Sequence, residues 1–130
     1  GKYDEAIKPF DQAISIDPQY AEARFNKGVA LGNLGKYDEA LKAFNQAISI
    51  NPQYADAWHN KGIALGNLGK YDEALQAFDQ TISINPQYAD AWYKKGAALK
   101  ALGRTSESDA AFAKAEELKN SAESLFFYCR

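Results

Sequence analysis

Cysteine, histidine and long apolar runs are scarce in this sequence, and each scarcity excludes a class of site. Cys129 is the only cysteine among 130 residues, which excludes an internal disulfide and a cysteine-based zinc site. His59 is the only histidine, which excludes a two-histidine metal site. No uninterrupted apolar run is long enough to span a bilayer or to serve as a signal peptide. We therefore expect no metal, no cofactor and no insertion into a membrane.

An excess of charge of one sign is also lacking. The 15 basic and 17 acidic residues give a formal net charge of -2, and they form no block of like charges. Nucleic-acid binding requires a basic face or stripe, so we expect no nucleic-acid partner. A chain with one cysteine is typical of a reducing compartment, which predicts a cytoplasmic protein. Cys129 has no base near it in the sequence and His59 stands alone, so we predict that the protein is not an enzyme.

What the sequence does contain is a repeat. Residues 55–88 align with residues 21–54 at a shift of 34 positions, with all but seven positions identical. The same shift places residues from Ala89 onward on the pattern, and residues 1–20 match its second half. This period is that of helix-turn-helix repeats, which stack side by side. The sequence therefore predicts an all-α solenoid of antiparallel helix pairs.

Glycine and proline divide each repeat into two helices. Gly35, Gly69 and Gly103 stop the first helices, because glycine adopts the left-handed conformation at low cost. Asn51-Pro52 ends a second helix, since the residue before proline is driven out of the helical region. We divide the chain into residues 1–20, the second helix of an incomplete repeat; residues 21–54 and 55–88, two complete repeats; residues 89–120, a third repeat with a degenerate second helix; and residues 121–130, a partial capping helix.

Each helix pair is predicted to hide an apolar seam. The second helix of the first complete repeat carries an apolar stripe at helical spacing, and we expect all of it to be buried: Tyr37, Ala40, Leu41, Phe44, Ala47 and Ile48. Gly28 on the first helix is small, which lets two helix backbones approach closely. The other side of the first helix is left free to face a ligand.

The two ends of the array depart from the pattern. Pro9 stands inside the first helix, where proline removes a backbone hydrogen bond and costs about 3 kcal/mol, so we expect a kink or fraying. Asn120 stands where the earlier copies have proline. Residues 123–130 align with the start of another first helix, and we expect Leu125 and Phe126 to lie on the last packed helix as a cap.

The pattern resembles the tetratricopeptide repeat. The residues at that family's signature spacing are Trp58, Gly62, Leu65, Tyr71, Ala74, Phe78 and Pro86, with Thr81 where the family prefers alanine. The set recurs as Gly28, Leu31, Tyr37, Ala40, Phe44, Ala47 and Pro52, and the resemblance covers essentially the whole chain. It implies a right-handed superhelix whose first helices line a concave groove that binds peptides or extended segments of other proteins.

The resemblance also implies which residues line that groove. By their place in the repeat they are Phe25, Asn26, Val29 and Asn33 in the first complete copy; His59, Asn60, Ile63 and Asn67 in the second; and Tyr93, Lys94, Ala97 and Lys100 in the third, with the acidic residues Glu22, Asp56 and Asp90.

Four asparagines form two pairs within this set. Asn26 and Asn33, like Asn60 and Asn67, are seven positions apart and so lie along one line of their helix. An amide both donates and accepts, and can pair with the backbone of any extended peptide. The alternative is that these amides hydrogen-bond locally or to water.

One ring per repeat occupies the fifth place. Phe25, His59 and Tyr93 are either anchors for a peptide or covers for their own neighbours in the fold. The place differs between two copies that otherwise barely differ, as expected where a binding surface is tuned.

One binding mode of the family can be tested on the residues. Repeats that clamp the carboxylate tails of heat-shock chaperones carry lysine, asparagine, asparagine, lysine and a basic residue at five places, which here hold Phe25, Val29, Asn60, Asp90 and Lys94. Only Asn60 and Lys94 fit, and Asp90 would repel a carboxylate. We expect no such clamp.

A lysine recurs at the seventh place. The helical wheel puts Lys27, Lys61 and Lys95 among the packing residues, so we expect their stems to pack while the ammonium groups reach an acid or water. The alternative is a positive stripe in the groove for an acidic partner.

These features predict a protein-interaction scaffold whose partner is a protein or a peptide. Two alternatives stay open. The first is self-association into a homo-oligomer through the stripe Tyr3, Ile7, Phe10 and Ile14 and the apolar tail Leu125–Tyr128. The second is that the chain is the targeting arm of a larger enzyme, such as a glycosyltransferase.

Overall fold

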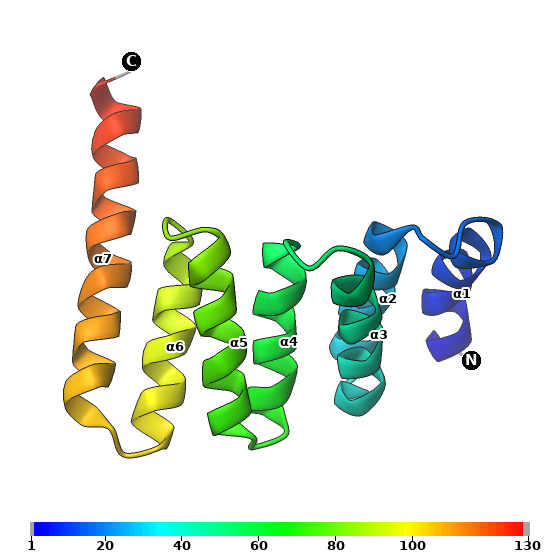
Figure 1. The fold of residues 1–130 in the computed structure, drawn as a ribbon, viewed down its shortest axis with the longest axis horizontal. Coiled ribbons are helices and arrows are strands. Elements are labelled where there is room, and N and C mark those ends of the chain that lie inside the picture. The colour runs from blue at the N-terminus through cyan, green and yellow to red at the C-terminus, as the bar shows by residue number, and fades with distance from the viewer. Residues whose placement is uncertain (1, 129–130) are drawn as a thin grey trace.

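Seven helices in a row make up the computed structural model, which describes residues 2–128, and the side chains of residues 3–123. They are α1 (Lys2–Ile16), α2 (Ala21–Asn33), α3 (Tyr37–Ile50), α4 (Ala55–Asn67), α5 (Tyr71–Ile84), α6 (Ala89–Ala101) and α7 (Thr105–Tyr128). Each helix packs against its neighbours in the chain, and α4 also touches α2 and α6. The predicted all-α array of adjacent helix pairs is confirmed (Figure 1).

Glycine ends each first helix, as predicted. Gly35, Gly69 and Gly103 have φ values of 77°, 75° and 77°. In this conformation the Lys36 N–H reaches back 2.9 Å to the carbonyl of Leu31, which satisfies a group at the end of α2. The hydrogen bond closes the turn into α3 and fixes the helix pair.

The interior of each pair consists of an aromatic ring against a glycine. The Phe44 ring covers Gly28 so closely that a Cβ on Gly28 would lie 2.5 Å from it, and Phe78 covers Gly62 in the same way. Among the residues expected in the seam, Ala40, Phe44 and Ala47 are buried, whereas Leu41 and Ile48 are half-buried. The missing side chain at Gly28 and Gly62 makes room for a ring of the second helix.

The tyrosine at the start of each second helix is not fully hidden. Tyr37 is half-buried and Tyr71 is exposed, so the prediction that this place belongs to the buried seam is wrong. The position is the first residue of its helix, where the ring lies at the edge of the packed pair and its hydroxyl stays near water.

The N-terminal helix α1 has no first helix beside it among the described residues. Phe10 and Ala13 are half-buried and Ala6 is exposed, whereas Phe44, at the place of Phe10, is only 2% exposed. The backbone is helical on both sides of Pro9, so the expected fraying is wrong. Proline removes one backbone hydrogen bond without ending the helix, and Ile7, two residues before it, is buried in a cluster with Leu31 of α2 and Ala40 of α3.

The C-terminal helix α7 differs from the prediction. We expected a second helix ending near Asn120 and a separate capping helix, but α7 is continuous from Thr105 to Tyr128 and projects beyond the other helices (Figure 1). Asn120 leaves the backbone N–H in place and no proline follows it, so nothing ends the helix there. The side chains of Leu125 and Phe126, which were expected to cap the array, lie outside the described residues.

None of the helices in the described part of the chain is both long and apolar enough to span a membrane.

Candidate functional site

Two pockets recur on the same side of the array, one repeat apart. The first pocket, of about 220 Å³, lies between the α2–α3 pair and α4; its lining is Gly28, Val29, Gly32, Asn33, Tyr37, Phe44, Asn60, Ile63, Ala64 and Asn67. The second pocket, of about 190 Å³, lies between the α4–α5 pair and α6; its lining is Gly62, Ile63, Gly66, Asn67, Tyr71, Ala74, Phe78, Lys94, Ala97 and Ala98. Nine of the ten positions of the first pocket recur 34 residues later in the second.

The pockets arise from small residues on the first helices. A Cβ built on Gly32 or Gly66 would meet no atom within 4 Å, so these glycines leave open space on the helix surface. Val29 and Ile63 supply an apolar wall, and the tyrosine that begins each second helix closes one side. The result is a hollow lined by both apolar and amide groups.

The two pockets contain about half of the predicted groove residues. Seven of them line a pocket: Val29, Asn33, Asn60, Ile63, Asn67, Lys94 and Ala97. Eight line neither: Glu22, Phe25, Asn26, Asp56, His59, Asp90, Tyr93 and Lys100. Sequence analysis missed Gly32 and Gly66, although their identical recurrence at the 34-residue period was a usable signal.

The rings at the fifth place of each first helix pack within the fold. The Phe25 ring lies 5.1 Å from that of Tyr54 and 5.9 Å from that of Phe44. The ring of Tyr93 lies 5.2 Å from Phe112, yet 54% of Tyr93 is exposed. Phe25 therefore fits the alternative that the ring covers its neighbours, whereas Tyr93 offers surface to a ligand.

His59 is the most enclosed of the three. It is 3% exposed, between the rings of Phe78 at 5.6 Å and Tyr88 at 4.9 Å. Its Nε2 lies 2.9 Å from Asp90 Oδ2, and its Nδ1 is buried without a hydrogen-bond partner. Burial lowers the pKa of His59, and the hydrogen bond and charge of Asp90 oppose that effect only in part.

The acidic residues at the second place of α4 and α6 are held by aromatic groups. The Tyr88 hydroxyl donates to Asp56 Oδ1 at 2.7 Å, and burial together with this hydrogen bond raises the pKa of Tyr88. Asp90 is held by His59 as described. Both contacts join residues about one repeat apart, so they tie neighbouring repeats together.

The asparagines form local hydrogen bonds and keep further capacity. Asn60 Nδ2 donates to the carbonyl of Asp56 at 2.9 Å, and Asn67 Nδ2 donates to the carbonyl of Ile63 at 3.0 Å. Each amide has two N–H donors and an oxygen acceptor, so one N–H and the oxygen stay available to a ligand.

Lys94 brings a charge to the second pocket. It stands where the first pocket has Asn60, and among the described residues no carboxylate lies within ion-pair distance of its ammonium group. The acid one turn before it on α6 is Asp90, whose carboxylate contacts His59. The second pocket therefore combines an apolar wall with a positive charge that has no ion-pair partner within residues 3–123.

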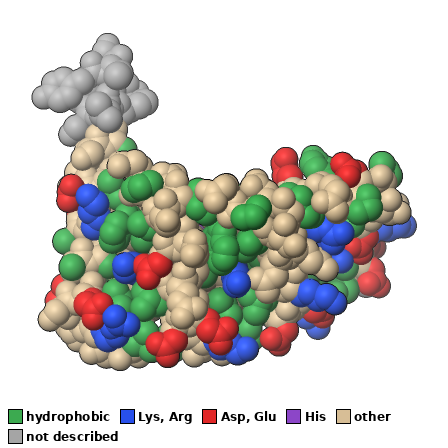
Figure 2. Space-filling view, in the orientation of Figure 1, with side chains coloured by type: hydrophobic (Ala, Val, Ile, Leu, Met, Phe, Trp, Pro, Cys, Tyr) green, Lys and Arg blue, Asp and Glu red, His purple; other side chains and the backbone are tan. Residues whose placement is uncertain are grey.

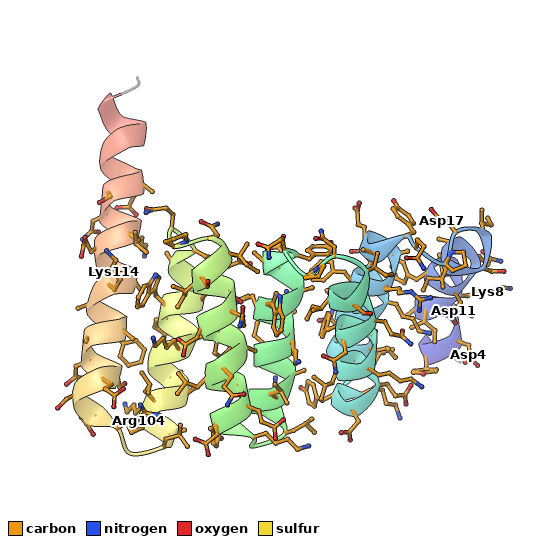
Figure 3. The ribbon with its side chains drawn as sticks, viewed as in Figure 1. Asp4, Lys8, Asp11, Asp17, Arg104 and Lys114 are labelled. Carbon is orange, nitrogen blue, oxygen red and sulfur yellow. The ribbon has the colours of Figure 1, made fainter. Side chains whose placement is uncertain are left out.

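The seventh-place lysines pack away from the pockets. Lys27 Nζ lies 2.7 Å from Asp11 Oδ1 on α1, a residue at the N-terminal end of the array (Figure 3), and Lys95 Nζ lies 2.8 Å from Asp79 Oδ1. Lys61 lies over the Trp58 ring, 4.9 Å from its centroid. The prediction of packed stems with ammonium groups directed at an acid is confirmed for Lys27 and Lys95, and the alternative of a positive stripe in the groove is wrong.

Charged side chains outside the pockets are of mixed sign, and the described residues contain no cluster of metal ligands. Acidic and basic side chains are interspersed with hydrophobic ones on the face in Figure 2. In residues 3–123 no group of three or more metal-ligating side chains converges.

Comparison with known proteins agrees with the fold. The profile of the family described as "Tetratricopeptide repeat" matches residues 21–54 and 55–88, a second of the same description matches residues 77–110, and one described as "TPR repeat" matches residues 1–35. Among curated proteins none matches this sequence.

Solved structures of MamA are similar along nearly the whole chain. One MamA structure has a TM-score of 0.89 at 30% identity, over 95% of this chain and 72% of that one. A second has a TM-score of 0.85 at 30% identity, over 95% and 68%. MamA from Desulfovibrio magneticus RS-1 has a TM-score of 0.84 at 21% identity, over 93% and 68%, and at that identity the likeness concerns the fold alone. Helix pairs, glycine stops, ring-on-glycine seams and matching profiles agree that the chain belongs to the tetratricopeptide repeat family.

Proposed function

We propose that this chain is a non-enzymatic protein-interaction module that binds an extended segment of another protein across the two pockets. The observation that carries the proposal is the recurrence of one pocket at two equivalent places, 34 residues apart. A surface that repeats its shape along the array matches a ligand that repeats its own geometry, and an extended chain has that property.

The spacing of the pockets suits such a chain. Neighbouring helices pack on the order of 10 Å apart, and an extended chain advances about 3.3 Å per residue. Side chains about three residues apart in the ligand would therefore enter successive pockets. Asn60 and Asn67 line the first pocket, where the second N–H and the oxygen of each amide can pair with the ligand's backbone.

The two pockets favour different side chains. The first is lined by apolar and amide groups, which favours an uncharged side chain. The second contains the unpaired ammonium of Lys94, which favours an acidic one. The clamp for carboxylate tails is disfavoured, because the place of its first lysine holds Phe25, whose ring packs against Tyr54 and Phe44.

A displayed library of random peptides tests the proposal. Gly32→Leu and Gly66→Leu together fill the pockets from positions where a side chain meets open space, so the fold is kept. Peptides selected on the wild type should lose binding to this double variant. The control is Gln76→Leu with Gln80→Leu on the exposed surface of α5, which should bind as the wild type does. Equal binding by all three proteins would refute the proposal that the two pockets bind the peptide.

One observation favours self-association as a second candidate. Phe10 and Ala13 on α1 are half-buried where their counterparts Phe44 and Ala47 are buried, so α1 presents an apolar strip. Sedimentation equilibrium over a range of concentrations tests it with Phe10→Ser as the variant. A strict monomer contradicts self-association. The role of targeting arm in a larger enzyme stays a prediction.

A further inference from the structure

The three joints between repeats differ in one ion pair. At two of them the seventh-place lysine contacts an aspartate on the preceding second helix: Lys27 with Asp11, and Lys95 with Asp79. At the middle joint, Lys61 of α4 follows α3, where the residue at the place of those aspartates is Asn45. The middle joint alone, in the part of the chain with described side chains, lacks this ion pair.

Lys61 and its counterpart Lys95 share two further features. Each ammonium lies over a tryptophan ring, at 4.9 Å from Trp58 for Lys61 and 5.2 Å from Trp92 for Lys95. Both side chains are half-buried. The ion pair is a difference between the two sites that a single substitution can isolate.

Lys61 opens onto a cavity of about 460 Å³ between α4 and α5. The cavity is also lined by Trp58, Glu73, Asp79 and two glutamines. These carboxylates disfavour an anionic ligand, but they do not disfavour an uncharged one. A small uncharged reagent can therefore enter the cavity and reach the amine without repulsion from these carboxylates.

Without a carboxylate partner, the charged form of the amine is stabilised less. Desolvation lowers the pKa of Lys61, and the charge of Glu73 opposes this with the smaller effect. The neutral amine is the nucleophilic form, and its fraction rises about tenfold for each unit by which a lysine pKa falls.

We propose that Lys61 is a site of covalent acylation by small uncharged acyl thioesters. The neutral Nζ attacks the thioester carbonyl carbon, a C–N bond forms and the C–S bond breaks. The sulfur leaves as a thiol with the proton from the amine, and Lys61 becomes an uncharged amide. The step needs no oxidant or reductant.

Site-resolved acetylation rates test this. The folded protein is treated with the uncharged thioester S-acetyl-N-acetylcysteamine at mildly alkaline pH, and the acetylation of Lys61, Lys27 and Lys95 is followed by peptide mass spectrometry. Lys61 should react about two- to fivefold faster than the other two, the range that corresponds to the loss of one surface ion pair. In denaturant the three rates should converge.

Reciprocal variants assign the cause. Asn45→Asp supplies the missing acid and should slow Lys61 to the rate of Lys95, while Asp79→Asn should speed Lys95 toward the rate of Lys61. All these positions are exposed or half-buried on helix surfaces, so folding is preserved. Equal rates at the three lysines in the wild type, or a Lys61 rate that Asn45→Asp leaves unchanged, would overturn the proposal.

Discussion

His59 on α4 and Asp90 on α6 join two repeats through one contact, with 2.9 Å between Nε2 and Oδ2. The imidazole is buried while 61% of the Asp90 side chain is exposed, so the contact runs from the interior to the surface. With Nε2–H donating to the carboxylate, Nδ1 is left as a buried acceptor without a partner. A proton on Nδ1 would be a buried donor with no acceptor, which agrees with the lowered pKa of His59.

This arrangement predicts that the protein loses stability in mild acid. The folded-state pKa of His59 is below its usual value, so as pH falls the unfolded state takes up the proton first. The stability that the neutral, buried imidazole of His59 contributes is fully present above about pH 6.5, and it is lost as the pH falls toward the folded-state pKa. Urea unfolding at several pH values between about 7.5 and 5 measures it.

The control for the pH effect is His59→Phe, because phenylalanine stands at the same place in the preceding repeat. The variant should show a shallower decline in the free energy of unfolding over the same range. A decline as steep as that of the wild type would assign the effect to the carboxylates instead.

Two glycines of α4 should respond to alanine in opposite directions. At Gly62 a Cβ would lie 2.5 Å from the Phe78 ring, so Gly62→Ala should destabilise by about 1–3 kcal/mol. At Gly66 nothing lies within 4 Å, so Gly66→Ala should stabilise by about 0.5–1 kcal/mol through helix propensity. Chemical denaturation of both variants checks the pair, and shifts of the same sign would contradict it.

Asn45→Asp should strengthen the middle joint. The new carboxylate occupies the place from which Asp11 and Asp79 contact their lysines, so it should pair with Lys61 and stabilise by about 0.2–1 kcal/mol. The gain should shrink at high salt. A double-mutant cycle with Lys61→Met isolates the pair: if Asn45→Asp stabilises equally in that background, the gain does not come from Lys61.

Replacement of Pro9 by alanine should slow hydrogen exchange at the amides of α1. Alanine restores one backbone hydrogen bond inside a helix that has a neighbour on one side only. Pro9→Ala should stabilise α1 by up to about 3 kcal/mol. Hydrogen exchange at the amides of α1 measures the local effect, because an end helix opens without the rest of the array. Ser15→Ala, also exposed on α1, is the control and should change exchange far less.

In the C-terminal helix α7, the residues at the expected break matter more than the alignment with earlier repeats. The expected break near Asn120 came from alignment with copies that carry proline, whereas Asn120 itself does not force the chain out of a helix. The alignment predicts that the third repeat is a degenerate copy with a second helix of ordinary length. Its effect on the structure is a longer helix.

The sequence by itself determined the array: the 34-residue period, the glycine at the end of each first helix, and the buried places Ala40, Phe44 and Ala47 of a second helix. These features depend on local conformation and on contacts within one helix pair, which a periodic pattern encodes directly. Only the tertiary structure decided that His59 is buried under Tyr88 and that its Nε2 contacts Asp90 of the next repeat. Those properties depend on side chains from neighbouring repeats that meet in space, and a helical wheel drawn for one helix contains no information about them.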